Sequence, residues 1–238
     1  MPIQPAALAA SIGALHPLDV EHGFTRTLQQ VVDAAKLLFH ADAAGLMLAD
    51  ADGVLRWASA SDLTAQVIEV GQERLAQGPC QTAFTQQAPA ALRDATLDLV
   101  YLELTAVLLA EGIMAGLSVP VEVEGGAIGT LDVYMRAPRD WDASEVAALQ
   151  TYAGLVGSLL ASAAAAHVQG RLAGQLQTAL EHRSVIERAK GLLMGRDGLD
   201  GPVAFERLRR SARSSRRTVP EIAREVLAQG SNGHRPRS

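Results

Sequence analysis

Two runs rich in Val, Leu and Ile, joined by a short acidic glycine turn, restrict the fold of this chain most strongly. The runs are residues 115–123 and 127–135, and the turn is Glu124-Gly125-Gly126. Short apolar runs separated by a glycine turn predict a β-hairpin. Residues 44–49 and 54–60 flank a second turn of this kind and predict a second hairpin. The sequence therefore predicts an antiparallel sheet.

Segments with helical spacing of apolar residues flank the two hairpins. Apolar side chains recur at intervals of three and four over residues 18–40, and further helices are predicted at 66–77 and 98–111. Residues 88–92 predict a short strand. An antiparallel sheet with flanking helices gives an α+β domain over residues 18–165. The Ala- and Pro-rich residues 1–17 are expected to be a flexible N-terminus.

A long helix is predicted from residue 144 to residue 182. Its apolar residues form an approximate stripe at intervals of three and four, without a breaking proline. The stripe could pair two chains as a coiled coil, or it could pack on the chain's own sheet. We expect sheet contact in the early part and contact with a second copy in the later part.

The last third of the chain predicts three short helices, at residues 183–194, 202–214 and 219–228. Thr218 and Glu221 have the spacing of a capping box at the start of the third helix. Gly230 is expected to end that helix, and residues 230–238 are expected to be a disordered tail. These helices predict a small three-helix bundle over residues 183–229.

Charge divides the chain into an acidic body and a basic end. Residues 1–170 hold 7 Lys and Arg against 19 Asp and Glu, a net charge of −12. Residues 171–238 hold 14 against 7, a net charge of +7. A basic end favours a polyanionic partner, although a solvated helical face is the alternative. Aromatic residues make up only 4% of the chain, which argues against a platform for stacking bases.

Two resemblances to known families follow from these segments. Residues 180–229 resemble an ANTAR domain, through RSVIERAKGLLM, AFERLRRSARSSRRTV and EIAREVL. Residues 20–165 resemble a GAF domain, through the helix and hairpin at the start, the Gly78-Pro79-Cys80 segment and LSVPVEVEGGAIGTLDVYMRAPRDW before a long helix. The pair is similar to actinobacterial regulators in which a GAF sensor precedes an ANTAR output domain.

The ANTAR resemblance implies RNA as the partner. It implies a transcription antitermination regulator that binds paired stem-loops in nascent leader transcripts and favours an antiterminator over the terminator hairpin. Arginine suits this work because its planar guanidinium can donate two parallel hydrogen bonds to a phosphate. Nine candidate RNA-binding residues follow: Arg183, Arg188, Lys190, Gly191, Arg209, Arg210, Arg213, Arg216 and Arg217.

Some of these candidates have a second interpretation. Arg188 and Lys190 lie off the apolar stripe of the first short helix, whereas Arg209 lies close enough to a stripe to be partly covered. Gly191 could be a packing glycine, and Arg183 could pair with Glu187 four residues later. We expect alanine at Lys190, Arg210 or Arg213 to weaken RNA binding and flatten its salt dependence.

Two other functions remain open on the residues alone. A bundle of three helices could be a DNA-binding helix-turn-helix, but Ser214-Ser215-Arg216-Arg217 joins the second and third helices without a glycine turn. The resemblance favours RNA over DNA. The third alternative is a sensor that acts only through protein partners.

The residues give no indication of an enzyme, a cofactor or a metal. The chain has one cysteine, Cys80, whereas a GAF-type methionine sulfoxide reductase needs more than one and a bilin-binding GAF domain usually presents a Cys-His pair. Its six histidines lack metal-ligand spacing, and no phosphate loop is present. A GAF pocket can hold an unidentified small molecule, but no residue indicates which.

Nothing in the sequence indicates a membrane protein. The N-terminus lacks a basic start, and the apolar stretch over residues 153–166 is shorter than the roughly 18–20 residues of a membrane span. We expect a cytoplasmic homodimer.

Overall fold

The computed structural model describes residues 23–50, 52–165, 171–215 and 217–232. The predicted flexible N-terminus and residues 233–238 of the predicted tail lie outside these ranges. The chain divides into two compact units. The first unit comprises Met1–Leu48 and Leu55–Leu176, and the second comprises Ala49–Val54 and Gln177–Ser238.

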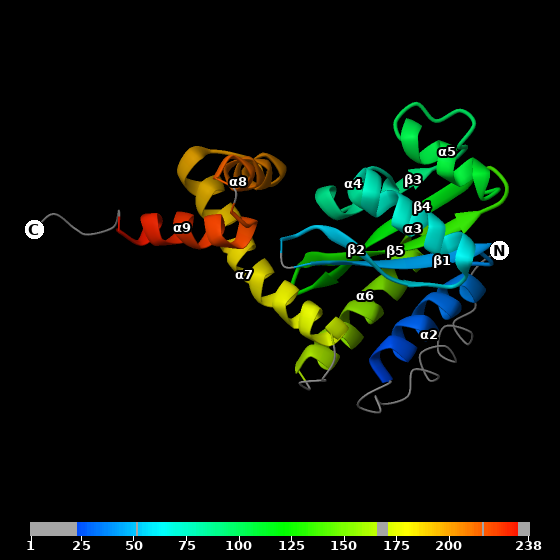
Figure 1. Cartoon of the computed structure of the whole chain (residues 1–238), viewed down its shortest axis with the longest axis horizontal. Helices are drawn as coiled ribbons and strands as arrows, with labels where there is room; N and C mark the ends of the chain where they lie inside the picture. The colour runs from blue at the N-terminus through cyan, green and yellow to red at the C-terminus, as the bar shows by residue number, and fades with distance from the viewer. Residues whose placement is uncertain (1–22, 51, 166–170, 216, 233–238) are drawn as a thin grey trace, which may run out of the picture. The chain divides into compact units, whose positions relative to one another are not determined.

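The first unit is built on a five-stranded sheet with the strand order β2-β1-β5-β4-β3 (Figure 1). The strands are β1 (Ala43–Ala49), β2 (Leu55–Ala60), β3 (Ala90–Leu92), β4 (Ala115–Val123) and β5 (Gly126–Met135). Strand β5 pairs antiparallel with both β1 and β4, and β3 pairs antiparallel with β4. The prediction of an α+β fold with an antiparallel sheet is confirmed.

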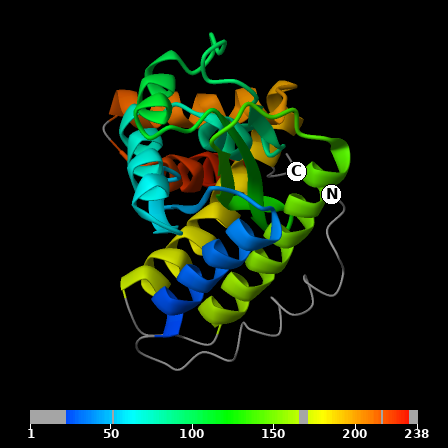
Figure 2. The same cartoon turned by 90° about the vertical axis from the view of Figure 1, so that its right-hand side faces the viewer.

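Two helices, α2 (Gly23–Leu38) and α6 (Ala143–Ala165), cover one face of the sheet and lie side by side (Figure 2). The Tyr152 hydroxyl of α6 donates a 3.1 Å hydrogen bond to the Val31 carbonyl of α2. An added Cβ at Gly157 would lie 2.1 Å from the Glu122 carbonyl oxygen. Glycine is therefore needed where α6 approaches the backbone of β4.

Helix α6 is the core helix of this unit. Among the described residues, one stretch, Ala143–Ala163, is long and apolar enough to cross a membrane by length and composition alone. Its residues Leu149, Tyr152, Val156 and Leu160 are buried at intervals of three and four. Packing of this stripe within the unit accounts for the apolar composition and confirms the expected early sheet contact.

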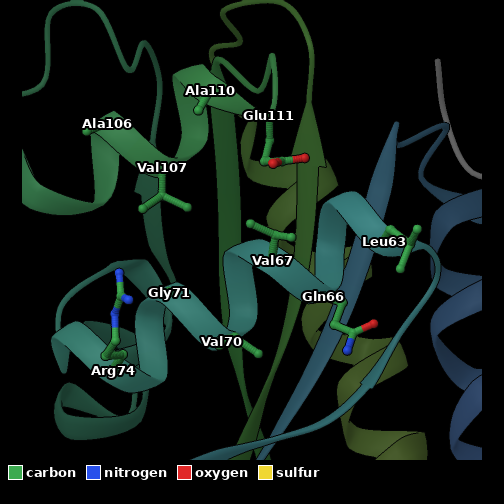
Figure 3. Close-up of a pocket in the computed structure, with 10 residues that line it drawn as sticks. All are labelled: Leu63, Gln66, Val67, Val70, Gly71, Arg74, Ala106, Val107, Ala110 and Glu111. Carbon is green, nitrogen blue, oxygen red and sulfur yellow. The ribbon is translucent and has the colours of Figure 1, made fainter.

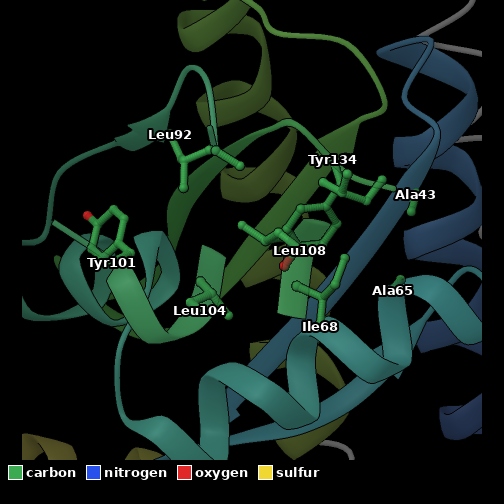
Figure 4. Packing of buried hydrophobic residues seen from close by; sticks show 10 residues of the cluster. Ala43, Ala65, Ile68, Leu92, Tyr101, Leu104, Leu108 and Tyr134 are labelled. Carbon is green, nitrogen blue, oxygen red and sulfur yellow. The ribbon is translucent and has the colours of Figure 1, made fainter. Parts of the chain in front are cut away.

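The other face of the sheet is covered by α3 (Leu63–Leu75), α4 (Pro79–Gln86) and α5 (Leu102–Ala110). Ile68 of α3 packs with Leu104 and Leu108 of α5 over Tyr134 of β5 (Figure 4). Asp62 caps the start of α3 by accepting a 2.9 Å hydrogen bond from the Ala65 N–H.

Helix α5 begins four residues later than predicted. The Asp98 carboxylate accepts hydrogen bonds from the backbone N–H groups of Val100 and Tyr101, at 2.9 and 2.6 Å. An aspartate that bonds the backbone two residues ahead forms a turn instead of a helix. The prediction of helix from residue 98 was therefore wrong for its first four residues.

The second unit contains a bundle of α7 (Arg171–Asp197), α8 (Gly201–Ser215) and α9 (Val219–Asn232). Its core is built by apolar residues of all three helices: Ile186, Ala189, Leu193, Ala204, Leu208, Ala212, Val219, Ile222 and Ala223. The predicted capping box is present, since the Thr218 N–H donates to Glu221 Oε2 at 2.9 Å and the Glu221 N–H donates to Thr218 Oγ1 at 3.4 Å.

Three predicted helix ends in this unit were wrong. Helix α7 continues to Asp197 instead of ending at residue 194. Helix α7 runs without a break across residues 182 and 183, where the connecting helix was expected to meet the bundle. Helix α9 continues to Asn232 instead of ending at Gly230. Residues 166–170, and the side chains of the predicted stripe positions Leu172, Leu176 and Leu180, lie outside the described part of the chain.

Candidate nucleic-acid interface and sensor core

Two arginines of the bundle are exposed and unpaired within the described part of the chain. Arg188 of α7 and Arg210 of α8 make no hydrogen bond or ion pair with any other described residue. Both were predicted as RNA contacts. Their guanidinium groups can therefore bind an external phosphate without first breaking an internal pair.

Two further predicted arginines form ion pairs at the surface. Arg209 donates to Glu206 at 2.9 Å, and Arg217 donates to Glu225. The four side chains are between 41% and 46% exposed. Exposed pairs of this kind stabilise a fold by about 0–1 kcal/mol, so an RNA phosphate can compete for these arginines.

Lys190 does not lie on the outer surface as expected. Its side chain is 11% exposed, and its Nζ lies 3.0 Å from both carboxylate oxygens of Glu187. The same Nζ lies 6.0 Å from the ring centroid of Phe205. Since Lys190 follows Ile186 by four residues, it falls on the buried stripe of α7, and the expectation that it lies off this stripe was wrong.

Of the four remaining predicted RNA contacts, the structure describes Arg183 and Gly191 but not the side chains of Arg213 and Arg216. Arg183 is partly exposed and interacts within the chain. Gly191 is exposed, and an added Cβ there would meet no described atom within 4 Å, which gives no support to the packing interpretation. Arg216 and the side chain of Arg213 lie outside the described part of the chain.

The bundle also contains a group of charged residues that sequence reasoning missed. Asp197, the last residue of α7, accepts hydrogen bonds from Arg196 Nε at 2.7 Å and Arg196 Nη2 at 2.9 Å, and a third from Arg207 of α8. The hydrogen bonds from Arg196 lower the pKa of Asp197, and Arg207 lowers it further. The sequence feature that could have indicated this group is the three-residue spacing of Arg207 and Arg210, which places both on the outer face of α8.

The first unit contains a buried polar cluster between the sheet and α3. The Tyr134 hydroxyl donates to Glu69 Oε1 at 2.8 Å, and Gln72 Nε2 donates to the Tyr134 oxygen at 2.9 Å. The backbone N–H of Cys80, at the start of α4, donates to Gln72 Oε1 at 3.2 Å. Glu69 and Gln72 are both fully buried. Sequence reasoning did not identify this cluster.

A second buried carboxylate, Asp132, lies on the same face of β5 as Tyr134 and faces Ser118 across the β4–β5 pair. One of its oxygens accepts a 2.9 Å hydrogen bond from the Thr130 hydroxyl. The other oxygen and the Ser118 hydroxyl have no hydrogen-bond partner in the described part of the chain. Burial raises the pKa of Asp132 to about 7. Burial, with the nearby Asp132 charge, also raises the pKa of Glu69.

The outer surface of the same unit has an apolar groove of about 670 Å³ between α3 and α5 (Figure 3). Val67 and Val70 of α3 are more than 40% exposed on its walls. Arg74 of α3 and Glu111, which follows α5, are among the residues that line the groove. The groove is distinct from the buried cluster, which lies beneath α3.

Comparison with family models decides the nature of both units. A GAF domain model matches residues 24–160, and an ANTAR domain model matches residues 174–227. This chain belongs to the GAF domain family and carries an ANTAR domain over residues 174–227. Both are regulatory domains. The buried cluster therefore lies inside the GAF domain, and the basic bundle is the ANTAR domain.

Solved GAF domains share the fold at low sequence identity. The GAF domain of a phosphoenolpyruvate-protein phosphotransferase from Coxiella burnetii is 20% identical, with a TM-score of 0.54, and the match covers 69% of this chain and 96% of that one. The equivalent domain from Acinetobacter is 15% identical, with a TM-score of 0.53, and the match covers 68% and 94%. At these identities the comparison shows the fold alone. No curated protein matches the chain.

The solved structures with this fold include an enzyme, the free methionine-R-sulfoxide reductase from Neisseria meningitidis. It is 18% identical, with a TM-score of 0.50, and the match covers 64% of this chain and 84% of that one. In the present GAF domain the sole cysteine, Cys80, is fully buried, and burial raises the pKa of its thiol. Such a thiol stays protonated, and the protonated form is a poor nucleophile.

Proposed function

We propose that this chain is an RNA-binding transcription antitermination regulator, in which the GAF domain senses a signal and controls the ANTAR domain. The ANTAR domain binds paired stem-loops in nascent leader RNA and favours the antiterminator structure. The protein acts in the cytoplasm and catalyses no reaction. The identity of the domains supports this proposal at the level of a sensor joined to an RNA-binding output.

The observation that carries the proposal is the exposure of Arg188 and Arg210 on a folded ANTAR bundle. These two guanidinium groups lie on different helices, and neither is paired with a carboxylate within the described residues. Arg209 and Arg217 are also positively charged, and each forms only a weak, exposed ion pair with a glutamate. A compact helical unit with such groups fits a folded RNA, whose phosphates follow a defined shape.

We further propose that the protein is a homodimer paired through α6 and α7. The outer side of α6 carries small exposed residues, Gly154, Ser158 and Ser162, at intervals of four. The Ser158 and Ser162 hydroxyls donate to carbonyls of their own helix, which leaves a smooth surface for a second helix. Two ANTAR domains held together would bind two adjacent stem-loops with a gain in effective concentration.

Binding to hairpin RNA and to duplex DNA of equal length tests the proposal. We expect the full chain to prefer RNA, and the Arg188→Ala, Arg210→Ala double variant to lose at least tenfold in RNA affinity. Arg74→Ala, which removes an exposed charge from the GAF domain, is the control and should bind like the parent. Preference for duplex DNA would support a helix-turn-helix regulator instead. Absence of binding to either at low salt would support a sensor that acts through protein partners.

A further inference from the structure

The carboxylate of Asp197 holds two guanidinium groups at once. Arg196 donates to it through both Nε and Nη2. Arg207 donates through Nη1 to Asp197 Oδ2, which also accepts from Arg196 Nη2. The group carries two positive charges and one negative charge, so a net positive charge remains.

The exposed fractions show which members of this group face outward. The Asp197 side chain is 22% exposed, whereas the Arg196 and Arg207 side chains are 45% and 50% exposed. The carboxylate is therefore the most covered member, and the guanidinium groups around it are open to solvent. Each retains N–H groups that do not bond to Asp197, because an arginine has five.

The position of the group continues the surface of the proposed interface. Arg207 and Arg210 are both exposed on α8 and differ by three residues, so their side chains are neighbours on one face of that helix. Arg196, at the end of α7, joins Arg207 through the shared carboxylate. Three guanidinium groups thus follow one another from the end of α7 along α8.

We propose that Arg196 and Arg207 form a phosphate-binding site for RNA, in which the Asp197 carboxylate occupies the position of an RNA phosphate in the free protein. This inference rests on the proposed function and names a further site within it. Carboxylate and phosphate accept the same parallel N–H bonds from a guanidinium. Asp197 keeps both arginines oriented, and it also competes with RNA, which sets an upper limit on affinity.

The variant Asp197→Asn separates this role from a purely structural one. It keeps the shape of the side chain but removes the charge that competes with RNA. The probe is a labelled RNA of two adjacent hairpins, enriched from a random pool on the parent chain. We expect Asp197→Asn to bind it threefold to tenfold more tightly. The plot of log affinity against log salt should steepen by about 0.7–0.9, the contribution of one additional phosphate contact.

The control variant removes one negative charge from the GAF domain instead of the ANTAR domain. Glu103→Gln replaces an exposed carboxylate of α5 in the GAF domain and should change RNA affinity less than twofold. Arg207→Ala should weaken binding in the parent and should abolish the gain in the Asp197→Asn background. If Asp197→Asn does not fold, as judged by circular dichroism, Arg207→Ala alone decides: at least a threefold loss supports the site, and unchanged affinity overturns it.

Failure of this inference is distinct from failure of the proposed function. If the parent binds the RNA and Asp197→Asn behaves like Glu103→Gln, then Asp197 only ties α7 to α8, and the phosphate site is wrong. If no RNA is enriched on the parent chain, the proposed function and the site are both wrong.

Discussion

The Tyr134 hydroxyl lies 2.8 Å from Glu69 Oε1, and this hydrogen bond joins the central strand of the GAF sheet to α3 beneath its surface. Glu69 and Asp132 are both fully buried, and neither forms an ion pair within the described residues. The other titratable groups around them are Tyr134 and Cys80. Burial without a cationic partner among the described residues therefore raises the pKa of both carboxyl groups.

This arrangement predicts that the GAF domain loses stability as the pH rises. The pKa of Asp132 is about 7 in the folded state, against 3.8 for an unperturbed group. Between these values the folded chain binds more protons than the unfolded chain, so the free energy of unfolding falls with increasing pH. The expected fall between pH 5 and pH 8 is on the order of a few kcal/mol. Urea unfolding followed by tryptophan fluorescence measures it, since Trp57 and Trp141 lie in the first unit.

The variant Asp132→Asn tests the source of this pH dependence. It should be more stable than the parent at pH 8, and its stability should depend less on pH. Some dependence should persist, because Glu69 also titrates. Asp140→Asn, a change at a side chain that is 89% exposed, is the matched control and should leave the profile unchanged. A parent chain that gains stability from pH 5 to pH 8 would contradict this account.

Gly157→Ala should destabilise the GAF domain. An added Cβ would lie 2.1 Å from the Glu122 carbonyl oxygen, where the β4–β5 register shifts between Val121 and Glu122. Because the obstacle is backbone, α6 or β4 must move, and overpacking of this kind costs about 1–3 kcal/mol. Gly154→Ala lies on the exposed side of the same helix, where a Cβ meets no described atom within 4 Å. It should stabilise the monomer by roughly 0.5–1 kcal/mol, so at chain concentrations too low for the proposed α6 pairing the two variants should shift the urea midpoint in opposite directions.

Lys190 is expected to support the ANTAR bundle rather than to contact RNA. Lys190→Met keeps an aliphatic stem over Phe205 but removes the bond to Glu187. It should lower the melting temperature of the bundle slightly and leave RNA affinity within twofold of the parent. Lys190→Ala should lower the melting temperature further, because the stem is also lost. A tenfold loss of RNA affinity in Lys190→Met without a change in melting temperature would restore Lys190 as an RNA contact.

The sequence predicted the elements that local patterns control. Both hairpins, the bundle helices and the Thr218–Glu221 capping box follow from turn residues, periodicity and caps. The start of α5 was misplaced because the Asp98 turn competes with helix formation, and helical spacing does not reveal that competition.

The buried cluster could not be predicted because its burial depends on tertiary packing. Asp132 occupies β5, whose two faces are both covered by helices, and a single sequence does not show which strand is central. Glu69 follows the buried Ile68 on α3, so periodicity alone leaves it between surface and core. The burial of Lys190 could have been predicted, because Lys190 follows the buried Ile186 by four residues on α7. It was missed because charged residues are usually exposed.

The decisive measurement is the affinity for hairpin RNA over a range of salt concentrations. It compares the full parent chain with the Arg188→Ala, Arg210→Ala double variant. The parent should bind RNA with an affinity that falls steeply with salt. The double variant should bind at least tenfold more weakly, with a slope reduced by about 1.4–1.8 for two lost phosphate contacts. Equal affinities and equal slopes for the two proteins would contradict the assignment of this surface to RNA.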